Sequence, residues 1–315
     1  MLDLTLLTKE QVKEFSPVLD EEDNQLDILK KYGKACGVTD FSHLLGCYVT
    51  EMFYTSEGKG LKDRTGMYFT KTFEQEGIND YYVYIIGEAG NLRRNEAFRD
   101  YEGLRPVLPY SSISSFSINE MIGESGIKEI EYGEYPQWIV DKDSFLEIEE
   151  EYKNGRLATT GKNYTVYLDY TKSRLETYNE YEYNGKKYIR FISGMNTDLM
   201  SDGRRISQGE PVWVKVEPIK WLVDEKTGIA LSKYIILSGI PFDDNKNPKN
   251  SFEETFIKKF MDTYLAKEIE WSVRKVELIE NNSFDFDSIF EDAIKKMNEI
   301  NNQEEVKKLT KRITN

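Results

Sequence analysis

The strongest constraint on the fold is a two-residue turn between two β-prone stretches. Asn184 and Gly185 stand between residues 181–183 and 188–192, which are rich in tyrosine, isoleucine and phenylalanine. Asn and Gly tolerate the positive φ angles of a type I′ turn, and this turn matches the twist of two antiparallel strands. The pair therefore predicts a β-hairpin.

Other stretches extend this sheet pattern. Apolar residues alternate with other types from Val212 to Val216, and the alternation resumes after Pro218. Further short strands are expected at residues 48–54, 67–72, 81–86, 229–231 and 235–237. No long helix separates successive strands, as βαβ units would require. The sequence therefore predicts irregular, mostly antiparallel sheets.

Helices are expected at both ends of the chain. Thr8 and Gln11 fit a capping box, in which two residues of the first turn satisfy each other's backbone amides. Ser251 and Glu254 fit a second box, and apolar residues then recur at helical spacing up to residue 265. Strands and helices together predict an α+β protein, with packed helices on irregular sheets.

Composition suggests three parts. Five of the seven residues from Ser111 to Ser117 are serine, which is typical of a linker, and we place a boundary near residue 122. The predicted parts are a helical preface with an irregular β domain (1–122), an antiparallel β domain with a packed helix (123–282), and a C-terminal helix with a basic tail (283–315).

Charge and cysteine content limit the partners and the cellular location that we expect for this chain. The 42 Lys+Arg residues and 56 Asp+Glu residues give a net charge of −14, which argues against nucleic acid as a directly attracted partner. No apolar run approaches the roughly 20 residues that cross a bilayer, so no membrane association is expected. Two cysteines and no charged-then-apolar leader give no sign of a disulfide-stapled secreted chain, and we expect a cytoplasmic protein.

The residues most often used in catalysis are scarce. His43 is the only histidine, and it lies four residues before Cys47 in what resembles a short capped turn ending at Gly46. Nothing nearby marks an activated thiol or an orienting acid. We therefore predict no catalytic residues and no cofactor.

Two loops resemble ligand-binding motifs but miss an essential feature. Residues 243–254 follow the spacing of an EF-hand loop, yet Pro248 stands where that loop requires glycine, so we predict a polar loop and no metal. Gly58 and Gly60 lack the Gly-Lys-Ser/Thr of a phosphate-binding loop, and a glycine-rich turn is the better interpretation.

Two charged clusters are the candidate binding surfaces. Arginines beside aromatic residues bind bases or acidic partners, although neighbouring carboxylates such as Glu96 and Glu102 offer them a structural alternative. Residues 128–151 hold nine acidic and two basic residues, and are either a solvated face or a surface that imitates nucleic acid. The candidate binding residues are Arg64, Tyr68, Arg93, Arg94, Tyr101 and Arg105, with Glu147, Glu149, Glu150 and Glu151.

Several segments resemble an uncharacterised domain family of Firmicutes and their prophages. The opening half of that family is similar to residues 132–137, which contain Tyr-Pro-Gln, and to residues 212–223, 229–242 and 252–265. Its closing half is similar to residues 64–70 and 103–108, so the two halves stand here in reversed order. The family is distantly similar to C-type-lectin-like domains and to the formylglycine-generating-enzyme fold. Cys36 and Cys47 lie outside the matching segments, so the resemblance does not imply oxidase activity.

The leading hypothesis is a non-catalytic binding protein, encoded by a phage or mobile element, that recognises a protein or another macromolecule. The resemblance to lectin-like folds implies such a role by analogy. Two alternatives remain open. One is an acidic inhibitor that mimics nucleic acid in the channel of a bacterial defence nuclease. The other is a carbohydrate-active hydrolase that uses two carboxylates.

Overall fold

The computed structural model describes residues 2–12, 26–76, 80–113, 119–122, 127–168, 174–243 and 249–280. The chain divides into two compact units, Met1–Val273 and Arg274–Asn315. All sites discussed below lie in the first unit. The predicted last helix from about residue 287 and the basic tail lie outside the described residues.

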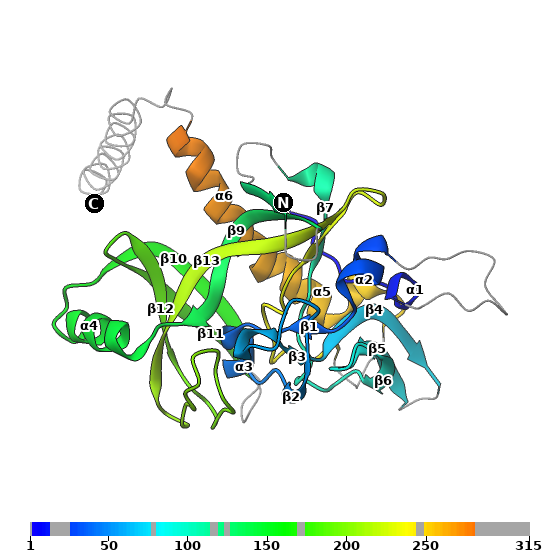
Figure 1. Cartoon of the computed structure of the whole chain (residues 1–315), viewed down its shortest axis with the longest axis horizontal. Helices are drawn as coiled ribbons and strands as arrows, with labels where there is room; N and C mark the ends of the chain where they lie inside the picture. The colour runs from blue at the N-terminus through cyan, green and yellow to red at the C-terminus, as the bar shows by residue number, and fades with distance from the viewer. Residues whose placement is uncertain are drawn as a thin grey trace, which may run out of the picture. The chain divides into compact units, whose positions relative to one another are not determined.

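An eight-stranded sheet organises the first unit (Figure 1). Its main path is β10 (Ala158–Leu168), β11 (Arg174–Tyr183), β12 (Lys186–Ile192), β13 (Pro211–Asp224), β14 (Ile229–Ser232) and β7 (Val107–Pro109). On the opposite edge of β13 lies β9 (Lys128–Ile139), which also pairs with β8 (Asn119–Ile122). The predicted hairpin is confirmed, since Tyr183 pairs with Lys186 and both turn residues have positive φ.

Two three-stranded sheets accompany the main sheet. One has the order β1 (Cys36–Gly37), β3 (Arg64–Gly66), β2 (Val49–Tyr54), and the other β4 (Tyr68–Gln75), β5 (Tyr81–Ile86), β6 (Leu92–Glu96). Every strand pair described is antiparallel. With 42% strand and 23% helix, the chain has the predicted α+β class.

The main sheet crosses the predicted boundary near residue 122. Leu108 of β7 pairs with Ala230 of β14, so strands from both sides of that boundary are neighbours. The predicted parts 1–122, 123–282 and 283–315 therefore do not coincide with the compact units, the first of which runs to Val273. A serine-rich segment separates strands of one sheet as readily as it separates domains.

The helices are mostly short. They are α1 (Lys9–Val12), α2 (Asp27–Tyr32), α3 (Asp40–Leu44), α4 (Lys142–Lys153), α5 (Phe256–Phe260) and α6 (Ala266–Glu280), with 3-10 turns η1 (Leu61–Asp63), η2 (Tyr110–Ser112) and η4 (Phe252–Glu254) and a π-helical turn η5 (Met261–Leu265). The Thr8–Gln11 capping box is confirmed by reciprocal bonds of 2.8 and 3.1 Å.

The second predicted capping box is wrong. Ser251 makes no side-chain cap, and residues 252–254 form a separate 3-10 turn. Helix α5 begins after Thr255, whose hydroxyl accepts a hydrogen bond from the Lys258 amide. The predicted apolar face is nevertheless buried, because Phe252, Ile257, Phe260, Met261 and Leu265 all enter the core.

Two tryptophans of β13 anchor the core. Trp213 and Trp221 are fully buried, and the Trp221 indole donates to the Tyr132 carbonyl at 2.9 Å. Among the described residues, no helix combines the length and the apolarity that a membrane span requires.

Candidate functional site

Three of the predicted binding residues belong to the interior. Arg105 is 1% exposed, and its Nε donates to the Ser232 carbonyl at 2.9 Å. Its Nη1 donates to the hydroxyl of buried Tyr68 at 3.1 Å, and the guanidinium lies over the Tyr68 ring. Arg64 is 3% exposed and donates to the carbonyls of Leu61 and Leu199. Because their polar groups face the protein, Arg64, Tyr68 and Arg105 fasten segments together and offer no contact surface.

The exposed arginines are paired with carboxylates. Arg93 forms an ion pair with Glu88 at 3.1 Å, and Arg94 pairs with Glu76. The Tyr101 hydroxyl accepts a hydrogen bond from Asn95 at 2.9 Å. Both arginines are on β6 and are paired with carboxylates, as the structural alternative expected, but their partners are Glu88 and Glu76 and not Glu96 or Glu102.

Much of the acidic run is also neutralised. Buried Glu149 accepts two hydrogen bonds from Arg190, at 2.9 and 2.8 Å, and one from the Trp213 indole at 3.0 Å. Burial raises the pKa of Glu149, but Arg190 and Trp213 outweigh this effect and hold the pKa below its usual value. Further carboxylates of residues 128–151 also form ion pairs, among them Glu129 with Lys233, Glu134 with Lys187, and Glu151 with Arg156.

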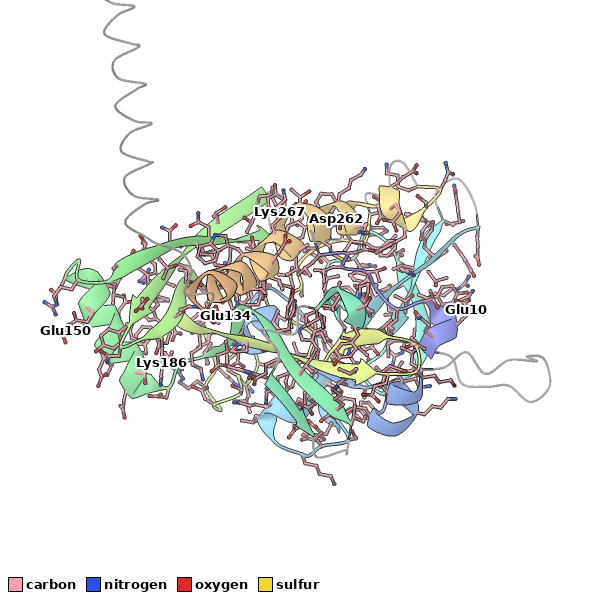
Figure 2. The ribbon with its side chains drawn as sticks, turned by 90° about the horizontal axis from the view of Figure 1, so that it is seen from above. Glu10, Glu134, Glu150, Lys186, Asp262 and Lys267 are labelled. Atoms are coloured by element: carbon pink, nitrogen blue, oxygen red, sulfur yellow. The ribbon has the colours of Figure 1, made fainter. Side chains whose placement is uncertain are left out.

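Two carboxylates of the predicted acidic surface remain exposed. Glu147 and Glu150 lie on α4, and Figure 2 shows Glu150 on its outer side. Since Glu149 and Glu151 are bound to arginines, the four candidate glutamates do not form one open acidic patch.

The segment around His43 is a packed turn. His43 is buried, and its Nδ1 lies 2.9 Å from the Cys47 carbonyl oxygen. Burial lowers the pKa of His43 and raises the pKa of the Cys47 thiol well above its usual range. A thiol held in this protonated form is a poor nucleophile.

The two near-motifs also satisfy themselves where they are described. The Gly60 amide donates to the Asp63 carboxylate at 2.8 Å, so an acid of the same loop satisfies this amide. Of the EF-hand-like segment, residues 244–248 lie outside the described residues, and Glu254 accepts from the Asn250 amide at 3.3 Å. The described residues contain no group of three His, Cys, Asp or Glu side chains able to hold a metal ion.

An open pocket of about 330 Å³ lies where β9 and β13 lose their regular register. Bulges fall between Lys215 and Val216 and again between Pro218 and Lys220, because proline cannot donate a hydrogen bond to a regular ladder. The pocket is lined by Lys62, Glu131, Gln137, Trp138, Lys215, Glu217, Pro218, Lys220 and Tyr234.

Gln137 makes this irregular backbone stable. Its side-chain amide donates to the carbonyls of Glu217 and Pro218 at 2.8 and 2.9 Å. These two bonds give hydrogen-bond partners to carbonyls at the irregular part of the ladder. The Tyr-Pro-Gln segment noted in the sequence therefore builds one wall of the pocket.

The pocket offers positive charge beside aromatic rings. The Lys62 ammonium lies 4.8 Å from the centre of the Trp138 ring, and Trp138 meets Tyr234 edge to face at 5.3 Å. Lys215 pairs with Glu217 at 3.6 Å. In the described part of the chain, neither Lys62 nor Lys220 forms an ion pair within 4 Å, although Glu131 also lines the pocket and stands opposite Lys220 in the strand register.

A buried ion triad supports the wall that carries Tyr234. The Lys233 ammonium contacts Glu57 and Glu129, each at 2.9 Å. Burial lowers the pKa of Lys233, but the two carboxylates outweigh it and keep the pKa above its usual value. Burial also raises the pKa of Tyr234 to about 12, so its hydroxyl stays a hydrogen-bond donor.

Sequence reasoning missed this pocket, although one signal was present. Pro136 and Pro218 interrupt strand patterns at positions where prolines indicate a bulge. Lys62, Trp138 and Tyr234 come from three distant segments and meet in this pocket. No local sequence pattern predicts that they meet. No protein-family model, curated protein or solved structure matches this chain. The resemblance to a prophage domain family and to lectin-like folds therefore stays a prediction.

Proposed function

We propose that this chain is a non-catalytic binding protein that recognises an acidic segment of a partner protein at the β9–β13 pocket. The observation that carries the proposal is the pair of lysines, Lys62 and Lys220, that line a preformed pocket without an ion-pair partner among the described residues. The lining holds three lysines and two glutamates, so it has one excess positive charge in a chain whose net charge is −14, and this excess favours a local anion.

Exposed apolar side chains on η1 and on β2, which is tied to η1, support a protein partner. Leu61 precedes Lys62 and is 36% exposed, while Met52 and Phe53 of β2 are 78% and 37% exposed. The Thr55 amide donates to the Asp63 carbonyl at 2.8 Å, which ties the end of β2 to η1. Exposed apolar side chains next to oriented charges are typical of a protein interface.

The proposed location, origin and alternative function each rest on a single observation. We infer a cytoplasmic setting from the two thiols, Cys36 and Cys47, which are free and buried. The proposed origin in a phage or mobile element rests on the sequence resemblance alone. The acidic inhibitor is a weaker proposal, because ion pairs neutralise Glu129, Glu134, Glu149 and Glu151.

Charge reversal in the pocket tests the function. We expect a Lys62→Glu/Lys220→Glu variant to lose a partner that the unmodified protein captures from cell extract, and we expect capture to weaken with added salt. Lys267→Glu is the control, since Lys267 is exposed on helix α6 and is not one of the residues that line the pocket (Figure 2). The pocket is not the binding site if all three proteins recover the same partners to the same extent.

A further inference from the structure

We propose that Glu268 and Lys162 form a proton-controlled latch that seats helix α6 on strands β9 and β10. Glu268 belongs to α6 and Lys162 to β10. Both residues lie in the first compact unit, which runs to Val273.

Close contacts bring α6 against both strands. The Glu268 carboxylate accepts a hydrogen bond from the Thr165 amide at 2.7 Å, and the Ser272 hydroxyl accepts one from the Glu134 amide at 2.9 Å. Figure 2 shows Glu134 beside this helix. Gly133 lies so close to Ile269 that a Cβ at this position would come within 2.4 Å of the Ile269 side chain. The seat is therefore tightly fitted.

Three buried polar atoms at this seat have no hydrogen-bond partner among the described residues. They are the Lys162 Nζ, the second carboxylate oxygen of Glu268 and the Tyr135 hydroxyl. Lys162 instead lies 4.6 Å from the centre of the Tyr164 ring and 5.4 Å from that of Trp271, which stands one turn after Glu268. An incompletely satisfied buried cluster costs stability, and this cost depends on its charge.

Every element around Glu268 contributes a titratable or charged group. Strand β10 provides Lys162 and Tyr164, and β9 provides Tyr135 and Glu134, the latter paired with Lys187 of β12. Strand β11 provides Glu180, which accepts hydrogen bonds from the Tyr164 hydroxyl at 2.7 Å and from Thr160 at 2.6 Å. Of these groups around Glu268, Lys162 and Glu268 itself combine an unpartnered buried atom with a pKa shifted toward neutral pH.

Burial shifts both groups toward their neutral forms. It raises the pKa of Glu268 to about 7 and lowers the pKa of Lys162 to about 8. A raised carboxyl pKa means that seating is strongest in acid and weakens as the pH rises from the solvated value of 4.5 toward 7. A lowered amine pKa means that seating strengthens again between pH 8 and the solvated value of 10.5. The seat is therefore weakest near pH 7–8, where both groups carry charge.

Hydrogen exchange of the full chain tests the latch. From these pKa values, we expect the protection of the α6 amides up to Val273 to rise on the order of tenfold from pH 7.5 to pH 5.5, after correction for intrinsic exchange. The amides of β13 provide the reference. Glu268→Gln resembles the protonated acid, so its α6 amides should be strongly protected at both pH values, whereas a merely damaging substitution would loosen the helix.

A second variant and a control complete the test. Lys162→Met removes the ammonium that favours ionised Glu268, so the pH-dependent step should move to higher pH. Lys267→Gln changes an exposed neighbour on the same helix and should behave like the unmodified chain (Figure 2). The latch is refuted if α6 protection in the unmodified chain is independent of pH, if it changes equally in β13, or if Glu268→Gln keeps the full pH response.

Discussion

Removal of the Glu149 carboxylate should strongly destabilise the sheet around β12 and β13. This side chain is 6% exposed and accepts three hydrogen bonds, two from Arg190 and one from the Trp213 indole. In Glu149→Ala, the Arg190 guanidinium, which is 22% exposed, loses its counter-ion, and a fully buried indole N–H loses its acceptor.

The magnitude follows from the groups left behind. Removal of one partner from a buried ion pair costs about 3–5 kcal/mol, and an orphaned buried N–H costs about 1–3 kcal/mol. Arg190 can reach water at its exposed edge, which reduces the first contribution. We therefore expect a loss of about 3–4 kcal/mol in the free energy of unfolding.

Urea denaturation monitored by tryptophan fluorescence measures this loss. Glu150→Ala is the matched control, because Glu150 is the exposed neighbour on the same helix and should change stability by less than about 0.5 kcal/mol. In the double variant Glu149→Met/Arg190→Met, both charges are absent, so we expect recovery of part of the loss. Equal stabilities of Glu149→Ala and Glu150→Ala would refute the argument.

The same ion pair predicts a dependence on pH. The pKa of Glu149 is lowered in the folded chain, so its contribution is complete above the unfolded value of 4.5 and is lost as the pH falls through the folded pKa. Acid unfolding of Glu149→Ala should therefore lack this component.

Two further substitutions test local geometry. Gly133→Ala should lower the free energy of unfolding by more than about 2 kcal/mol in thermal unfolding, because φ is +67° and the added Cβ meets Ile269. Gly155 has the same φ but open space around it, so Gly155→Ala should cost about 1 kcal/mol. Thr255→Ala should cost about 1 kcal/mol through the lost helix cap, while Ser251→Ala should cost almost nothing; the reverse order would restore the capping box predicted from sequence.

Local patterns predicted the elements better than they predicted the surroundings of charged residues. The turn at Asn184 and Gly185 needs positive φ, and asparagine and glycine are the residue types that adopt positive φ most readily. The burial of Arg105 depends on Tyr68 and on the Ser232 carbonyl, which come from distant parts of the chain. The number of charged residues in a stretch of sequence does not show how many are buried or paired. Both the basic and the acidic binding surfaces predicted from these numbers were therefore too large.

The pocket could not be predicted from the sequence for a related reason. Two prolines indicated irregular strands, but the site also needs Lys62 from a short turn and Tyr234 from the segment after β14. Side-chain convergence across separate segments is a property of the tertiary packing. The prediction of the second capping box was wrong because a 3-10 turn and an α-helix start with similar residues. The sequence alone did not distinguish the two.

Strand β13 also constrains the order in which the chain can fold. It pairs with β9, made earlier, with β12, made just before it, and with β14, made after it, and β14 in turn recruits β7 from far upstream. Contacts of such sequence separation slow folding. During synthesis, β7 and the edge of β9 that faces β13 have no partner strand until β13 and β14 leave the ribosome. Unpaired strand edges of this kind favour aggregation until their partner strands are available.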